Sequence, residues 1–209
     1  MGRSGEDPAR SQHLGSDVIV RTAGAADVPG IYSVARSVGS AVNQPDRGFL
    51  LADYAEQPER HMAFFADRVQ RLEHFRVAEQ RGNILGFIVA YRGEEWLLEE
   101  PRWLGEVAWH PGFTPAAVTD FVMIDKVAVH ADGTGRGIGT VMHENLLECL
   151  RDERIDDVFQ EAVIDPTPNL ASLAYKHKQD FSMAGIRYDE HDGTQHAVLV
   201  YHKAVDPSG

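Results

Sequence analysis

The chain has 209 residues, of which 43% are hydrophobic and 25% are charged, a composition typical of one globular domain rather than of a disordered, collagen-like or coiled-coil chain. Its 20 Lys and Arg against 32 Asp and Glu give a net charge of −12, which disfavours nucleic acid as a partner because phosphates would be repelled. No apolar run approaches the roughly 20 residues of a membrane span, and the single cysteine, Cys149, cannot form an internal disulfide. We therefore expect a cytoplasmic domain over residues 17–205, without a membrane partner, that follows a flexible leader over residues 1–16.

Hydrophobic patterning predicts strands and helices along the first half of the chain. A short β-branched strand at 18–21 is followed by a helix that begins near Asp27 and Pro29, and a second helix begins at Pro58. Two further β-rich runs are separated by four residues typical of a tight turn, so we expect them to be antiparallel neighbours. These runs span residues 74–80 and 84–91.

Residues 93–118 interrupt this pattern. The segment holds all three tryptophans of the chain, five glutamates and three prolines, and it shows little periodicity, so we interpret it as an irregular insertion. Aromatic side chains among acids suit an organic cation, which makes the tryptophans candidate substrate contacts. Packing of the same side chains onto the body of the domain is the alternative of equal weight. The tryptophans are Trp96, Trp103 and Trp109.

The strongest signal is a strand that runs into a glycine loop and then into a helix. The strand at 121–129 leads to Thr134-Gly135-Arg136-Gly137-Ile138-Gly139-Thr140, and a helix with an apolar stripe that includes Cys149 follows. Backbone N–H groups and the positive end of the helix dipole meet at such a loop, which predicts an anion site. The loop lacks the Gly-Lys-Ser/Thr of a mononucleotide cradle, and its spacing does not fit the dinucleotide fingerprint. The remaining elements expected are strands at 157–164, 181–188 and 196–203 and a helix at 170–178.

Gly137-Ile138-Gly139 after Val127-Ala128-Val129 resembles the glycine motif of the GNAT superfamily of acyl-CoA-dependent N-acyltransferases, with Thr134 where the family has Gln or Arg. The resemblance covers most of the chain but not the insertion. It implies an α+β (mixed α/β) fold with a central, mostly antiparallel sheet of six to seven strands, splayed between the fourth and fifth strands and flanked by about four helices. It also implies acetyl-CoA as co-substrate, bound by the loop at its pyrophosphate and by the edge of the fourth strand along its pantetheine arm. The donor-binding residues so implied are Val127, Ala128, Val129, Thr134, Gly135, Arg136, Gly137, Ile138, Gly139, Thr140 and Asn169.

The segment from Asn169 to Phe181 resembles a later motif of the family, Asn-x-x-Ala/Ser followed by Tyr and then Gly-Phe. With Asn169 and Phe181 held in register, Lys176 falls where the family has Tyr. Aligning Ala171 instead puts Tyr175 there and requires one extra residue before Phe181. Tyrosine at this place protonates the departing thiolate in many relatives, so Tyr175 is the candidate general acid, and a packed core tyrosine is its alternative role.

An amine must lose a proton before it attacks a thioester, so the site needs a base. Asp125 is the first candidate, because it lies near the middle of the fourth strand on the face of Val127 and Val129; an ion pair with Lys126 is its alternative role. Glu161 on the fifth strand is the second candidate base and a candidate substrate contact. The insertion glutamates follow, namely Glu99, Glu100 and Glu106. The ten histidines show no metal-ligand spacing, so no metal is expected.

Three functions are compatible with these residues. The first is an N-acetyltransferase that moves an acetyl group from acetyl-CoA to the primary amine of a small molecule by direct transfer in a ternary complex. The second keeps this chemistry but acetylates a protein N-terminus or lysine. The third is a non-catalytic acyl-CoA-binding sensor module, favoured by the departures from the family motifs. Dimers are common in the family, so a homodimer is also left open.

Overall fold

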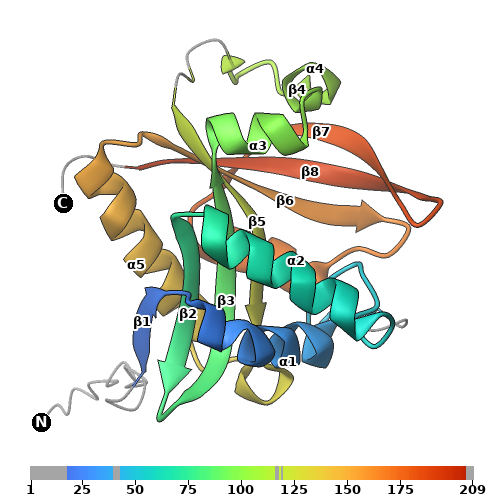
Figure 1. Cartoon of the computed structure of the whole chain (residues 1–209). Helices are drawn as coiled ribbons and strands as arrows, with labels where there is room; N and C mark the ends of the chain where they lie inside the picture. The colour runs from blue at the N-terminus through green and yellow to red at the C-terminus, as the bar shows by residue number, and fades with distance from the viewer. Residues whose placement is uncertain (1–17, 40–42, 116–117, 119, 206–209) are drawn as a thin grey trace, which may run out of the picture.

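The computed structural model describes residues 18–39, 43–115, 118 and 120–205, and it shows helices on both faces of one mixed sheet (Figure 1). The predicted leader over residues 1–16 lies outside the described residues. Within the described part, the sheet has eight strands in the order β1-β2-β3-β5-β6-β8-β7-β4. The strands are β1 (Ile19–Thr22), β2 (His74–Gln80), β3 (Asn83–Arg92), β4 (Ala108–Trp109), β5 (Phe121–Val129), β6 (Asp157–Asp165), β7 (Ser182–His191) and β8 (Thr194–Ala204).

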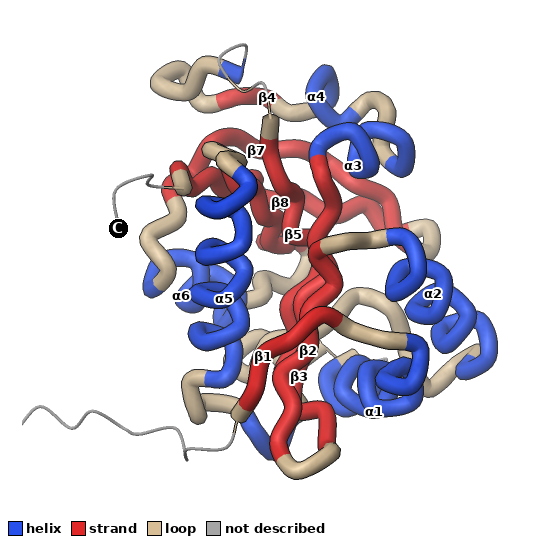
Figure 2. The backbone as a smooth tube through the Cα atoms, turned by 60° about the vertical axis from the view of Figure 1, so that its left-hand side comes forward, coloured by secondary structure: helices blue, strands red, loops and turns tan. Residues whose placement is uncertain are grey.

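The helices form a layer on each face of the sheet, with α1 and α2 on one side and α5 and α6 on the other (Figure 2). Each layer covers its own buried apolar cluster: a phenylalanine-rich one under α1 and α2, and a mainly aliphatic one under α5. In the part of the chain that the structure describes, no helix is long and apolar enough to cross a membrane. The helices are α1 (Val28–Val38), α2 (Pro58–Arg71), α3 (Gly93–Glu99), α4 (Trp103–Glu106), α5 (Ile138–Glu153) and α6 (Leu170–Lys178), with short 3₁₀ turns at Ala25–Asp27 and Ala131–Gly133.

The pairing of the strands confirms the predicted α+β class. Only β5 and β6 are parallel, and every other neighbouring pair of described strands is antiparallel. The predicted hairpin of β2 and β3 is present, and its turn places Arg81 and Gly82 at positive φ. β7 and β8 form the expected second hairpin around Asp192 and Gly193. The short β4 brings the described strands to eight, above the six to seven expected.

The predicted splay of the sheet lies between β5 and β6. Residues 121–124 of β5 pair with residues 157–160 of β6. Beyond Ile124 and Gln160, the described residues of the two strands no longer pair with each other. On its other side β5 stays bound to β3, with a register shift that leaves Asp125 as an extra residue. Because a bulge bends the strand that carries it, β5 turns away from β6 directly after their last paired residues.

The insertion is not irregular over residues 93–109, so that expectation was wrong for this part. It forms α3, α4 and the edge strand β4, which pairs with β7. The backbone N–H of Arg92 donates to the Glu95 carboxylate (2.8 Å), which satisfies a donor at the start of α3. The indole of Trp103 anchors the segment: it is 0% exposed and makes ring contacts with four other aromatic side chains. Tertiary packing, rather than local periodicity, therefore fixes this region.

Cys149 is half-buried rather than part of the core, which corrects a second expectation. The buried stripe of α5 advances by four residues at a time, through Ile138, Met142, Leu146 and Leu150. Cys149 lies to one side of this stripe, where Arg76 donates from Nη2 to its Sγ (3.1 Å).

Trp103→Ala should lower the free energy of unfolding by about 3–5 kcal/mol, because it removes a fully buried aromatic side chain from the core. Leu98→Ala, in α3 of the same insertion but 84% exposed, should change it by less than about 0.5 kcal/mol. Denaturant unfolding of the two variants measures both values. Equal small effects would show that the insertion is not packed onto the domain.

Candidate active site

A cavity of about 510 Å³ occupies the gap between the separated strands. Its wall includes residues 124–129 of β5 and 160–163 of β6, the glycine loop, and side chains from α3, α6 and β7. The loop before α5 and helix α3 lie near opposite ends of β5 (Figure 1). One continuous cavity thus joins the start of α5 to the insertion.

The glycine loop holds a backbone conformation suited to anions. Gly135 and Gly137 both have φ of +80°, a left-handed conformation that favours glycine. A Cβ on Gly135 would meet no atom within 4 Å, so its backbone angle rather than space requires glycine there. α5 begins immediately after Gly137, and the first N–H groups of a helix have no partner inside it. These groups and the helix dipole can bind a phosphate.

Nearly all of the predicted donor-binding residues line the cavity, and Arg136 is the exception. Arg136 is exposed and does not belong to the cavity wall, so a direct contact with the donor is not supported for it. Asn169 lines the cavity, but its side chain is used to hold the fold. Its Oδ1 accepts from the N–H of Ser172 (3.1 Å) at the start of α6, and its Nδ2 donates to the carbonyl of Phe49 (2.9 Å).

Two neighbouring residues of α6, Tyr175 and Lys176, face the cavity in different ways. The Tyr175 hydroxyl donates to the carbonyl of Gly139 (2.9 Å) in the glycine loop, and burial raises the pKa of this phenol. Lys176 is 4% exposed and donates from Nζ to Oγ of Ser172 (2.8 Å). Burial lowers the pKa of Lys176 to about 7, a shift that Glu161 partly opposes.

Asp125 does not share a face with Val127 and Val129, as had been expected, because it is the extra residue of the bulge. Its carboxylate pairs with Nζ of Lys126 (2.5 Å), which also lies over the ring of Phe64 on the α2 side of the sheet. Val127 and Val129 pack against the opposite cluster, under α5. Burial alone would lower the pKa of Lys126, but the adjacent carboxylate outweighs it and the pKa is raised. The predicted alternative role of Asp125, an ion pair, is therefore observed.

Glu161 follows Gln160, the last residue of β6 that pairs with β5, and its carboxylate accepts three hydrogen bonds. It accepts from Nε1 of Trp103 (2.7 Å) and from Nε and Nη2 of Arg187 (2.7 and 2.9 Å). Trp103 therefore supports Glu161 from behind and is not on the cavity wall, and neither is Trp109. The prediction that Trp103 and Trp109 contact the substrate directly is therefore corrected. Trp96 does line the cavity.

Of the three insertion glutamates considered, only Glu100 reaches the cavity. Glu99 pairs with Arg68 and Arg71 on α2, and Glu106 pairs with Arg102. Among the described residues, the Glu100 side chain has no hydrogen-bond or ion-pair partner. Burial raises the pKa of its carboxyl, Arg187 opposes this, and Asp189 and Glu161 add to it.

A family comparison identifies the fold and the chemistry of this site. The model of the acetyltransferase (GNAT) family matches residues 42–181, more than half of the chain. The chain belongs to the GNAT family. It is an acyltransferase, as the resemblance predicted, and the family uses acetyl-CoA as co-substrate. No curated protein matches the chain by sequence.

Solved structures with the GNAT fold resemble the whole domain at low sequence identity. The polyamine N-acetyltransferase of Drosophila melanogaster has a TM-score of 0.61 at 14% identity, covering 90% of this chain and 100% of its own. The ribosomal-protein-S18-alanine N-acetyltransferase of Escherichia coli has 0.58 at 14%, covering 92% and 96%. An N-acetyltransferase of Staphylococcus aureus has 0.56 at 19%, covering 91% and 100%. At such identities these similarities establish the fold alone.

The GNAT cavity also contains polar residues that the sequence did not single out. Gln160 is 1% exposed at the point where the strands part, and its Nε2 has no hydrogen-bond partner within the described structure. Arg187 is 4% exposed in β7, and Tyr54 joins the wall from the segment before α2. For Gln160 and Arg187, the available signal was a polar residue inside a predicted strand.

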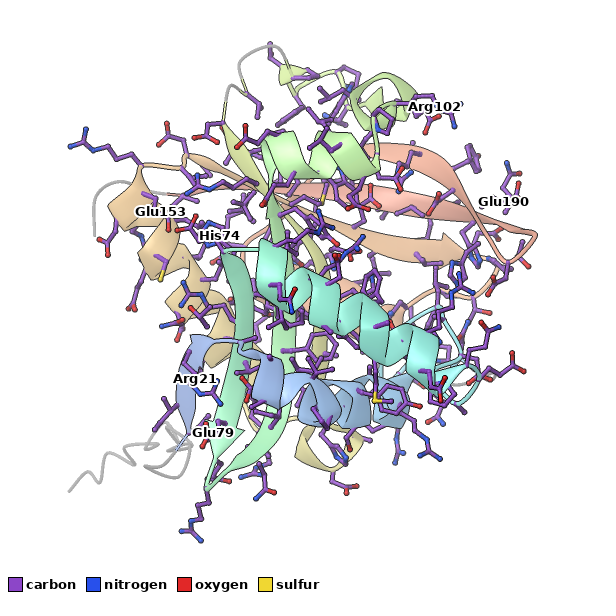
Figure 3. All side chains as sticks on the ribbon, viewed as in Figure 1. Arg21, His74, Glu79, Arg102, Glu153 and Glu190 are labelled. Atoms are coloured by element: carbon purple, nitrogen blue, oxygen red, sulfur yellow. The ribbon has the colours of Figure 1, made fainter. Side chains whose placement is uncertain are left out.

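Among the described residues, one group of potential metal ligands lies outside the cavity, where the start of β2 meets the end of α5. Glu73, His74 and Glu153 bring their ligand atoms within 4.8 Å of one another, and Figure 3 shows His74 and Glu153 close together. Arg92 already occupies this group, with Nη2 2.5 Å from Glu153 and 3.2 Å from Glu73. The group is therefore a charge network that ties β3 to α5, and none of its members lines the cavity.

Gly135→Glu should abolish the stabilisation that acetyl-CoA gives the GNAT domain. Acetyl-CoA at 100 times its Kd should stabilise the parent by about 2.7 kcal/mol, a shift in Tm of several degrees. The variant places a carboxylate at the proposed phosphate site, so this shift should disappear. Gly82→Glu is the matched control, because Gly82 has the same φ of +80° and equal free space but lies in the β2–β3 turn. A Gly135→Glu protein that still responds to acetyl-CoA would refute the assignment of the loop.

Proposed function

We propose that this GNAT protein transfers the acetyl group of acetyl-CoA to a primary amine of a small molecule, by direct transfer within a ternary complex. The observation that carries the proposal is the single cavity that joins the glycine loop to an acidic wall built by α3, β6 and β7. The loop N–H groups would bind the pyrophosphate, and the free edge of β5 would bind the pantetheine arm. The acetyl group would then lie where the strands part.

Direct transfer is favoured over an acyl-enzyme by where the thiol lies. Cys149, the single cysteine of the chain, contacts Arg76 and does not reach the cavity wall. A ternary complex needs only that donor and amine be held together in the correct orientation, and this accounts for much of the rate in such reactions.

The acidic wall supports a cationic amine as acceptor. Arg187 pairs with Glu161 and with Asp189 (3.6 Å) on this wall, so Glu100 is the carboxylate there that remains to attract an ammonium group. The Glu161 carboxylate accepts hydrogen bonds from Arg187 and Trp103, and the Asp125 carboxylate forms an ion pair with Lys126. Glu100 keeps its lone pairs free and has a raised pKa, which suits a group that binds the ammonium and then accepts its proton. We therefore place Glu100 ahead of Asp125 and Glu161 as the base.

The activity itself is tested with acetyl-CoA and a panel of acceptors. Thiol release should be seen with small amines that carry an additional positive charge. Peptides with free and with blocked N-termini form the second arm; faster turnover of the free peptides would instead favour a protein acceptor. Stabilisation by acetyl-CoA and CoA without thiol release on any amine would favour the sensor module. We also propose that the protein acts in the cytoplasm.

Glu100→Gln should raise the KM for the amine by about 10-fold or more, because it removes a charge-assisted hydrogen bond to the ammonium. The KM for acetyl-CoA should stay the same. Glu94→Gln, on the exposed side of α3, is the matched control and should leave both values unchanged. Steady-state kinetics with each substrate varied in turn measures the effect. An unchanged KM for the amine in Glu100→Gln would contradict the role of this carboxylate.

A further inference from the structure

Lys176 is a buried cation that the fold does not neutralise. Its side chain is 4% exposed on the cavity wall, and within the described structure no carboxylate forms an ion pair with it. Its one hydrogen bond is to the neutral hydroxyl of Ser172. A buried charge without a partner costs stability, so such a group is often retained for a function.

The helix α6 settles which residue occupies the tyrosine position of the family motif. Asn169 caps the start of α6 and Phe181 is buried after its end. Asp180, which replaces the motif glycine, has φ of +58°, so the backbone keeps a left-handed turn there. The segment thus fits the motif without an extra residue, and Lys176 stands in the place of the tyrosine. Tyr175, one residue earlier, points to the carbonyl of Gly139 instead.

The groups around Lys176 come from three elements. Ser172 lies one turn earlier on α6, Glu161 faces it from β6, and His143 faces it from α5. Burial lowers the pKa of His143 to about 4, and Lys176 contributes to this shift, so the imidazole is neutral near pH 7. Glu161 is already neutralised by Arg187. Lys176 is therefore the group in this set that can exchange a proton near neutral pH.

We propose that Lys176, rather than Tyr175, is the catalytic acid that protonates the departing thiolate of CoA. This inference rests on the proposed acetyl transfer. In that step the amine nitrogen forms a bond to the thioester carbonyl carbon, the C–S bond breaks, and sulfur leaves with the electron pair. Before the attack, Glu100 takes one proton from the bound ammonium and passes it to water. The proton on Nζ then moves to sulfur and gives the CoA thiol, while the second proton lost by the nitrogen, from the new amide, moves to Glu100. Both groups then return to their starting forms by exchange with water, so the net products are amide, thiol and one proton released to water.

The strengths of the two acids favour Lys176. A thiol has a pKa of about 8.5, so an ammonium with a pKa of about 7 gives its proton to a thiolate downhill. The Tyr175 phenol has a raised pKa and is already donating to Gly139, so its proton is less available.

The first test measures the ionisation of the thiol of bound CoA and needs no acceptor amine. Because Lys176 and the bound thiol would exchange protons, they should titrate as a coupled pair, so part of the thiolate signal of bound CoA should shift to a step near pH 7, below the single step of free CoA. The ultraviolet absorbance of the thiolate measures this during a pH titration. Lys176→Met should abolish the shift, and Tyr175→Phe should retain it. An unshifted thiol in the parent, or a shift lost only in Tyr175→Phe, overturns the role of Lys176, whereas failure of CoA to bind overturns the proposed function as well.

Steady-state kinetics with an amine that the enzyme acetylates distinguishes acid catalysis by Lys176 from a purely structural role of this residue. Lys176→Met should lower kcat by about 100-fold with little change in the KM for acetyl-CoA, and it should lose the decline in kcat above pH 7 that deprotonation of Lys176 causes in the parent. Lys176→Tyr should recover activity and move that decline to higher pH, whereas Lys176→Arg, which holds its proton too tightly, should not recover it. His177→Gln, exposed on the same helix, is the control for folding. Full activity in Lys176→Met, or recovery by Arg, would overturn the proposal.

The stability of the same variant checks that the lysine is buried as a strained cation. The unfolded chain, with a lysine pKa of about 10.4, binds this proton more tightly than the folded protein does. The folded parent should therefore gain stability as the pH rises from about 7 toward 10, and Lys176→Met should lack this gain. Equal pH dependence of Tm in both proteins would contradict the lowered pKa on which the acid role depends.

Discussion

The parting of β5 and β6 is the constraint on which the site depends. The two strands are the one parallel pair among the described strands, and they pair only from Phe121 to Ile124 and from Asp157 to Gln160. A parallel pair requires a crossover, and here α5 supplies it, so the glycine loop at its start lies next to the free edge of β5. The bulge at Asp125 then bends β5 away. The free edge, the anion site and the cavity thus have one structural origin.

Lys126, Arg187 and Lys176 line this cavity, and the three cations differ in their partners. Lys126 is paired with Asp125 in the bulge, and Arg187 is paired with Glu161. Both pairs hold their carboxylates in place, which reduces the ability of these carboxylates to act as bases. Lys176 has only a serine hydroxyl. The distribution of partners therefore separates groups that hold the geometry from groups that remain free to exchange protons, and Glu100 is the free group among the acids.

The sequence predicted the periodic elements and the glycine loop, because both depend on residues close together in the chain. It did not predict α3 and α4, whose order comes from packing around Trp103 rather than from a long apolar stripe. The face of Asp125 was assigned wrongly because a single extra residue reverses the alternation of a strand. The proposed choice of Lys176 over Tyr175 depends on one residue of register, and the left-handed turn at Asp180 that supports it leaves no clear signal in an aspartate. Local patterns were thus sufficient for the scaffold and for the place of the glycine loop, but not for side-chain directions.

Different segments of the chain build the proposed donor half and the proposed acceptor half of the cavity. Family membership therefore says little about the acceptor. β5, the loop and α5 build the donor half from the segments that carry the family motifs. The insertion contributes to the acceptor half, through Glu100 and Trp96 on the wall and through Trp103, which holds Glu161 from behind. The family model matches residues 42–181 and so spans the insertion, which corrects the expectation that the insertion lies outside the resemblance. The proposed donor contacts come from the loop and β5, whereas the proposed acceptor contacts come partly from the insertion. A change of acceptor would thus require changes in α3 and α4, and the glycine loop could stay as it is.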